Sequence, residues 1–364
     1  MSSPTVSVLV NTYNHERYIA QALQSVIDQD FPANQMEIIV VDDGSTDATS
    51  EIVREFLPRI RYIRKANGGQ VSAFNAGVAE ARGGFVAFLD GDDWWASDKL
   101  NKVVAAFDAH PQIAAVGHAY HEVDESGAVC ATMIPTRNCL SLEDISQARS
   151  SAPLRVFLGT SRFAIRRAVL DQTLPVPAEL PFFDNFVFTQ AIAISGAQLL
   201  AQPLCSYRLH SGNLYASSSP NEETLWTKYK LLRGLLQHLP SRLSGFGISE
   251  ECVSAFLAAD RLEANQLHLL LEGGSRLEAF HTELDSFRLA YRNPDLGYKA
   301  FKTFVLLLAL LVPPKSFYRL RRWYAAHGLR SVREHIGGAY LTQPEVTRPS
   351  ESTVDKTARR RVRV

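Results

Sequence analysis

The chain has 364 residues, of which 46% are hydrophobic and 21% are charged. This composition is typical of a folded protein with a large core and excludes an intrinsically disordered chain. Its 38 basic and 38 acidic residues cancel, so the overall charge gives no reason to expect a nucleic-acid partner. The four scattered cysteines indicate free thiols rather than a zinc site or a disulfide framework. No basic stretch of a secretory signal opens the sequence, so we expect a cytoplasmic protein.

Short β-branched runs alternate with amphipathic segments along the first hundred residues. Strands are expected at 6–10, 37–41, 61–63 and 85–89. Helices are expected at 18–27, with Asn14 as N-cap, at 46–57, at 70–81 and from about Ser97. Continuous apolar strands separated by helices predict an α/β fold, in which helices cover both faces of a mostly parallel, Rossmann-like sheet.

Each predicted strand is followed by a polar or glycine-rich loop. In chain order these loops read "NTYNHERY", "VDDGSTD", "KANGGQVSAFNAG" and "DGDD". Taken singly, "DDGSTD" is explained as well by a turn with a helix cap, and "NGG" by a turn. Because ligands of such sheets bind beyond the carboxyl ends of the strands, four loops of this kind together predict one binding site.

The last of these loops places Asp90, Asp92 and Asp93 directly behind an apolar strand. Neighbouring carboxylates repel one another unless they are solvated, protonated or neutralised by a cation. Oxygen ligands favour Mg²⁺ or Mn²⁺, which commonly bind one or two carboxylates together with substrate phosphates. Asp90 and Asp92 are expected to point to the same side, whereas Asp93 is expected to lead the next helix or to support the site from behind. A capped turn before that helix is the alternative explanation.

These motifs carry a resemblance to a known family. The segments "VSVLVNTYNHERYIAQALQSVIDQDF", "EIIVVDDGSTDAT" and "NGGQVSAFNAGVAEARGGFVAFLDGDDWW" resemble, in order and spacing, the family 2 glycosyltransferases of the GT-A fold. The match covers the first hundred residues closely and extends with weaker features to about residue 215. The resemblance implies an inverting enzyme that uses a nucleotide-diphosphate sugar and a divalent metal ion.

The same resemblance assigns roles to individual residues. It implies that the nucleotide sugar is held by Asn11, Tyr13, Asp42, Asn67, Gln70, Asn75, Asp90 and Arg208. Asp90 and Asp92 match the DxD motif of the family, and the implied metal ligands, for Mg²⁺ or Mn²⁺, are Asp92, Asp90 and His210. Arg208 offers a fork for phosphate oxygens, although an Arg-x-His pair outside this context is more often a surface feature.

The catalytic base is expected to be Asp184. Family members usually carry a Glu-Asp pair, or a lone Asp, well after the DxD motif, and here the matching segment "LPFFDNFVFTQ" holds only this acid. One carboxylate is enough to deprotonate the acceptor hydroxyl in an inverting reaction. Asp184 could instead cap the helix that follows. Upstream, Thr160 and Ser161 match a segment that commonly lines the acceptor side.

Beyond residue 220 the pattern becomes helical. An apolar run at 304–312 is too short to span a bilayer and is surrounded by Lys299, Lys302, Lys315, Arg319, Arg321 and Arg322, with Phe317, Tyr318 and Trp323 between them. This composition suits an element lying on an anionic membrane through 297–336, but also a buried helix or a dimer contact. The last residues are polar and end in a basic run, which predicts a disordered tail.

We therefore expect a GT-A domain at 1–220, with a nucleotide-binding half at 1–100 and an acceptor half at 101–220. A helical region follows at 221–340 and a disordered basic tail at 341–364. The expected partners are a UDP- or dTDP-type sugar and a glycan or lipid-linked acceptor, and no nucleic acid. A nucleotidyltransferase and a non-catalytic nucleotide-sugar sensor or scaffold are the alternative functions.

Overall fold

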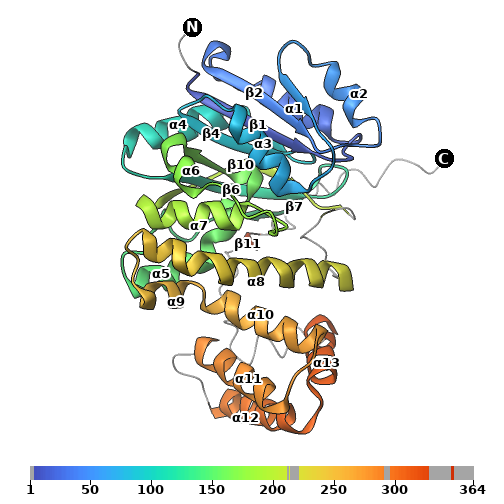
Figure 1. Ribbon diagram of the computed structural model, residues 1–364, viewed down its shortest axis with the longest axis vertical. Helices are drawn as coiled ribbons and strands as arrows, with labels where there is room; N and C mark the ends of the chain where they lie inside the picture. Colours follow the sequence, from blue (N-terminus) through green and yellow to red (C-terminus); the bar gives the residue numbers. More distant parts are fainter. Residues whose placement is uncertain (1–3, 211–212, 214–220, 291–295, 328–345, 348–364) are drawn as a thin grey trace, which may run out of the picture.

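A mixed β-sheet with covering helices occupies one end of the molecule, and a helical region occupies the other (Figure 1). The computed structural model describes residues 4–210, 213, 221–290, 296–327 and 346–347. The change from sheet to helices falls between Arg208 and Glu222.

The first half of the sheet is parallel, as the sequence predicts. Its strands lie in the order β4-β1-β2-β3, with bounds β1 Val6–Thr12, β2 Met36–Asp42, β3 Arg61–Arg64 and β4 Phe85–Asp90. The accompanying helices are α1 Ile19–Ile27, α2 Thr49–Arg54, α3 Gln70–Glu80 and α4 Lys99–Ala109. Every residue of β1 is buried, which explains why its sequence is a continuous apolar run and not an alternating one.

The second half of the sheet adds antiparallel neighbours. β9 (Phe163–Arg166) lies between β4 and β6 (Ala115–Val123) and is antiparallel to both. β10 (Ala197–Arg208) runs parallel to β6. The remaining strands are β5 Trp94–Trp95, β7 Val129–Met133, β8 Cys139–Leu140 and β11 Val346–Thr347, and the helices are α5 Ile145–Ser151, α6 Arg167–Thr173 and α7 Asp184–Ser195. Short 3₁₀ helices lie at Ala33–Gln35, Ala152–Leu158 and Thr160–Arg162.

Six helices build the C-terminal region as far as the structure describes it, at 221–290 and 296–327. Their bounds are α8 Glu222–Gly245, α9 Glu250–Phe256, α10 Ala258–Leu271, α11 Arg276–Ala290, α12 Leu296–Leu311 and α13 Pro314–His327. α8 packs on α7, α10 packs on α8, and α13 packs on α10, so the helices continue away from the sheet along the long axis (Figure 1). A second apolar core, separate from that of the sheet, lies among α8, α10, α12 and α13. Within the described ranges, no helix combines the length and the apolar character needed to cross a membrane.

Two sequence predictions about local structure need correction. Asn14 is not the N-cap of α1, because the helix starts at Ile19 and Asn14 has a left-handed backbone with φ of 56°. Its side-chain oxygen instead accepts the N–H of Thr46 at 2.8 Å, which ties the first loop to the second. α2 is shorter than the predicted 46–57, because the residues before Thr49 form that loop. Of the predicted tail, residues 341–345 and 348–364 lie outside the described residues, and Val346–Thr347 pairs with β7.

Candidate active site

The carboxyl ends of three neighbouring strands bring the predicted site residues to one edge of the sheet. Asn11 on β1 lies in register with Asp90 on β4. Thr12, the next residue of β1, lies in register with Asp42 on β2. The predicted nucleotide-side residues and the first acid of the DxD motif therefore lie at the ends of adjacent strands, as expected for a site beyond the strand ends.

Four carboxylates lie within electrostatic reach of one another at this edge. Burial, followed by the charges of Asp92, Asp93 and Asp184, raises the pKa of Asp90 well above its usual value. Burial and the charge of Asp92 raise the pKa of Asp93 to about 7. Asp93 does not lead the next helix: its side chain accepts the backbone N–H of Arg208 at 2.9 Å, so it supports the loop from behind. Such a concentration of negative charge favours a bound cation.

Asp92 differs from its neighbours because two histidines face it. Nε2 of His210 lies 2.9 Å from Oδ2 of Asp92, and Nε2 of His15 lies 3.9 Å from the same oxygen. Burial acts to raise the pKa of Asp92, but the hydrogen bond with His210 and the charges of both histidines hold it below its usual value. The sequence did not single out His15, and its only signal was its place in the loop after β1.

The donor set fits a divalent cation that shares its coordination with a ligand. Asp92 and His210 supply one oxygen and one nitrogen donor, and Asp90 lies beside them. In the part of the chain that the structure describes, no three His, Cys, Asp or Glu side chains are gathered closely enough to hold a metal by themselves. An ion with few protein ligands, completed by phosphate oxygens, is the usual arrangement for Mg²⁺ at a nucleotide.

Arg208 does not offer a free fork for phosphate, which corrects the sequence prediction. Its side chain is enclosed, with 3% of the residue exposed. Nε donates to the carbonyl oxygen of Asp92 at 3.0 Å, Nη1 to that of Glu125 at 2.9 Å, and Nη2 to Oε1 of Gln21 at 2.6 Å. The guanidinium also lies 4.6 Å from the ring centres of both Tyr18 and Trp94. Because all three of its nitrogens donate to protein oxygens, Arg208 fixes the backbone of the loop that carries Asp92.

Asp184 is the first residue of α7 and faces the acid cluster. The N-cap of this helix is Phe183, so the capping role considered for Asp184 is not the one observed. Burial raises the pKa of Asp184, although its hydrogen bonds with Asn185 act in the opposite direction. Its charge also reaches Asp90. A buried carboxylate with a raised pKa close to the proposed donor site has the character of a general base.

Thr160 and Ser161, predicted to contact the acceptor, are buried beneath the acidic loop. The hydroxyl of Ser161 accepts the N–H of Asp90 at 3.0 Å. Its carbonyl oxygen accepts Nε1 of Trp95 at 3.1 Å and Nζ of Lys99 at 2.8 Å. Ser161 therefore supports the loop and does not face an acceptor.

The nucleotide side of the site contains polar atoms that lack partners. Both amide atoms of Asn11 and Oε1 of Gln70 are buried without a hydrogen bond. Since buried polar groups are nearly always paired, these atoms are suited to a ligand. Asp42 already accepts the N–H of Ser45 and the hydroxyl of Tyr62, each at 2.7 Å, while Tyr13 is exposed.

Asn67 lies in the loop before α3 and Asn75 lies within the helix. The loop is held by Asp43, a residue that the sequence did not single out. The side chain of Asp43 accepts the N–H of Gly69 at 2.7 Å and that of Gly68 at 3.1 Å. Gly44, with φ of +80°, lies so close that a Cβ there would meet the Asn67 nitrogen at 2.8 Å. Glycine is therefore required for the two loops to approach each other.

Two basic residues near the acids, the half-buried Arg162 and the buried Lys99, were also missed. Arg162 lies between the rings of Tyr120 and Tyr207, at 4.4 and 5.0 Å, and its charge lowers the pKa of Asp90 and Asp93 against the dominant effect of burial. Burial lowers the pKa of Lys99 to about 7. These residues belong to segments distant in sequence, so no local motif indicated that they would meet the acids.

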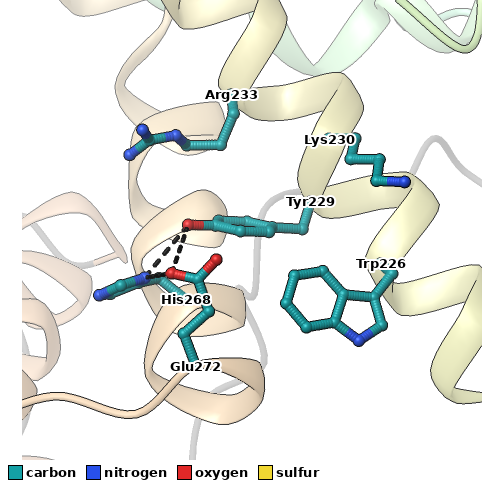
Figure 2. Close-up of a pocket in the computed structure, with 6 residues that line it drawn as sticks. All are labelled: Trp226, Tyr229, Lys230, Arg233, His268 and Glu272. Carbon is teal, nitrogen blue, oxygen red and sulfur yellow. Dashed lines mark hydrogen bonds and ion pairs between the residues drawn. The ribbon is translucent and has the colours of Figure 1, made fainter.

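A hollow of about 430 Å³ lies between α8 and α10, away from the carboxylates (Figure 2). Its lining residues are Trp226, Tyr229, Lys230, Arg233, His268 and Glu272. Tyr229 extends from α8 toward α10, where its hydroxyl lies 3.1 Å from Nδ1 of His268 (Figure 2). Nδ1 of His268 is in turn 2.7 Å from a carboxylate oxygen of Glu272. The hollow thus combines aromatic rings with two exposed cations.

The fold and the site together define a glycosyltransferase of the GT-A type, and comparison with known proteins gives the same class. Residues 7–172 match the family described as glycosyl transferase family 2. An uncharacterized glycosyltransferase of Nostoc, alr2836, is 32% identical over 221 residues, which cover 59% of this chain and 67% of the relative. The putative glycosyltransferase EpsH of Bacillus subtilis is 28% identical over 222 residues, 59% of this chain and 63% of the relative.

The crystal structure of Staphylococcus aureus TarS 1-349 in complex with UDP-GlcNAc has the same fold. It superposes with a TM-score of 0.52 at 21% identity and covers 80% of this chain and 94% of that one. The aligned part of this chain spans about two thirds of the length of the Nostoc and Bacillus relatives. The chain belongs to the family 2 glycosyltransferases.

Proposed function

We propose that the protein transfers a sugar from a nucleotide-diphosphate sugar to a hydroxyl group of a glycan or lipid-linked saccharide, with inversion at the anomeric carbon. The observation that carries this proposal is the cluster of Asp90, Asp92, Asp93 and Asp184 beside the unpaired amide of Asn11. A nucleotide diphosphate with a divalent cation would satisfy both the negative charge and the unpaired atoms. A UDP- or dTDP-type donor is favoured because an amide and a carboxylate can pair with a uracil or thymine edge.

The residues of this chain divide the chemistry between them. Asp92 and His210, with Asp90 beside them, would hold Mg²⁺ or Mn²⁺, which supplies charge neutralisation of the departing diphosphate. Asp184 accepts the proton of the acceptor hydroxyl, whose oxygen attacks the anomeric carbon as the nucleotide leaves from the opposite side. Arg208 and Asp93 keep the acidic loop in position. His15, 3.9 Å from Asp92, would help to orient that carboxylate.

We further propose that the enzyme works in the cytoplasm, peripherally on the inner face of the plasma membrane, where it contributes to cell-surface polysaccharide or glycoconjugate synthesis. The cation-rich segment 297–336 supports this location, although residues 328–336 lie outside the described residues. The hollow between α8 and α10 supports an acceptor that carries phosphate or carboxylate groups, because Lys230 and Arg233 line it beside two aromatic rings.

The test is incubation with Mn²⁺ and a panel of nucleotide sugars, in the presence of saccharide acceptors. Slow release of nucleotide diphosphate from one donor, accelerated by an acceptor, is the expected result. Release of pyrophosphate would instead identify a nucleotidyltransferase. Binding of a donor without any turnover would identify a sensor or scaffold, and either outcome would overturn the proposal.

A further inference from the structure

Helix α12 exposes a stripe of large apolar residues. Phe304, Leu307 and Leu311 are 60%, 54% and 72% exposed. Their spacing of three and four residues aligns them in one stripe along the helix. The opposite side of the helix buries Lys302 and Ala309. Val305 and Leu308 also pack against the second core, so the helix buries one apolar side and exposes another where an ordinary surface helix carries polar residues.

Helix α13 adds cations and an aromatic residue to this surface. It packs inward through Phe317 and Tyr318, whereas Leu320 and Trp323 are exposed. Between Leu296 and Trp323 the sequence contains six Lys or Arg residues and no acidic residue. We define the docking face as the exposed apolar residues of both helices: Phe301, Phe304, Leu307, Leu310, Leu311, Leu320 and Trp323.

Glu283 of α11 fixes the orientation of both helices. Its buried carboxylate forms ion pairs with Arg321 of α13 and, at 3.9 Å, with Lys302 of α12. A buried carboxylate paired with two cations is costly to break, so the helices cannot easily rotate to bury their apolar stripe. Two of the six cations thus point inward, and the other four, Lys299, Lys315, Arg319 and Arg322, lie around the docking face with exposed or half-exposed side chains.

We propose that the docking face lies flat on the surface of an anionic lipid bilayer. At roughly 1.5 Å per residue, α12 is about 24 Å long, which suits a helix lying in the interface. Anionic headgroups complement the surrounding cations, whereas two copies of this face would bring like charges together. Binding of the docking face to lipid does not depend on the proposed function. Only its purpose, access to a lipid-linked acceptor, rests on that function.

The order of the helices relates this surface to the active site. α13 packs on α10, α10 on α8, and α8 on α7, which begins with Asp184. The hollow lined by Lys230 and Arg233 lies between α8 and α10, in the middle of this series (Figures 1 and 2). From the membrane inward, the order would therefore be the docking face, the hollow and Asp184. A membrane-bound acceptor with a charged headgroup would pass them in that order.

The experiment is cosedimentation of the full chain with vesicles of phosphatidylcholine and phosphatidylglycerol. The double variant Leu307→Ser/Leu311→Ser should bind these vesicles about tenfold more weakly than the unchanged protein. Arg319→Gln/Arg322→Gln should weaken binding about fivefold per cation, and this loss should disappear on pure phosphatidylcholine. The matched control Leu57→Ser/Val129→Ser, which alters exposed apolar residues of the sheet region, should bind normally. All variants keep the residues after 327 unchanged, so a basic tail cannot account for the differences.

Equal binding by the Leu307/Leu311 variant and the control would overturn the proposal. Sedimentation velocity without lipid tests the competing occupant, because a dimer that the same variant converts to a monomer would show that a second copy covers the face. Donor hydrolysis in the absence of vesicles should be equal in all four proteins. Loss of vesicle binding with unchanged hydrolysis supports the docking face, whereas absence of hydrolysis in every protein would contradict only the proposed function.

Discussion

Replacement of Arg208 by lysine distinguishes a positioning role from a phosphate-binding role. The guanidinium donates to the carbonyl oxygens of Asp92 and Glu125 and to the side chain of Gln21, and it is enclosed. Lysine keeps the positive charge, but its compact ammonium group cannot span the three acceptors that a planar fork reaches. At least two acceptors then lose their donor in a buried setting.

The magnitude follows from the number of bonds lost. A buried polar group without its partner costs about 1–3 kcal/mol, so Arg208→Lys should lower the free energy of unfolding by about 3 kcal/mol. The loss should appear in urea unfolding without any substrate. Because the carbonyl group of Asp92 belongs to the same loop as its carboxylate, Mn²⁺ affinity, measured by calorimetry with a nucleotide diphosphate present, should also fall.

A matched control and a refuting result complete this prediction. Arg17→Lys alters an exposed arginine that pairs with the side chain of Glu125, and it should change neither stability nor metal affinity. If Arg208→Lys leaves unfolding and Mn²⁺ affinity unchanged and only raises the KM for the nucleotide sugar, the positioning role is refuted and a phosphate contact is supported.

Three further predictions concern the acids. Asp92→Asn should abolish metal-dependent release of nucleotide diphosphate while circular dichroism and unfolding remain normal, and near-normal turnover would contradict the metal role. Asp184→Asn should slow transfer by about 10²–10⁴-fold while calorimetry shows unchanged donor binding. Because burial raises the pKa of Asp184, the normal enzyme should lose activity on acidification at a higher pH than an exposed aspartate would dictate, and a flat acidic limb in the pH-rate profile would argue against it as base. Asp260→Asn should lower the free energy of unfolding in urea by about 1–3 kcal/mol, because it removes the charge that accepts Nη1 and Nη2 of Arg155, each at 2.7 Å, where both side chains are only 11% exposed. The double change Arg155→Met/Asp260→Leu should restore most of this loss, and equal losses in both variants would contradict the argument.

The sequence predicted the nucleotide half of the fold well because its physical signals are local. β1, β2, β3 and β4 are continuous apolar runs, and each begins and ends within about two residues of its predicted limits. The insertion of β9 between β4 and β6 could not be predicted. That pairing joins chain segments that are far apart in sequence. The composition of a four-residue strand such as β9 does not indicate which strand it will pair with.

The sequence singled out residues whose own loop suggests a role, and it missed partners that come from elsewhere in the chain. Asp92 was recognised from its own motif, but its neighbour His15 is 77 residues away along the chain. Arg208 was assigned to phosphate because its type suits that ligand. Its acceptors are two backbone oxygens and the side-chain oxygen of Gln21, which no sequence pattern reveals.

The position of β10 has a consequence for the order in which the protein acquires competence during synthesis. This strand delivers Arg208 and, just after it, His210 to a loop that was made about 116 residues earlier. The first four strands can pair once residue 90 has been made, since β1 pairs with β2 and β4, and β2 pairs with β3, all within the first ninety residues. The nascent chain therefore completes the sheet edge that carries Asn11, Asp42 and Asp90 before His210 can reach Asp92, which requires β10 to pair with β6.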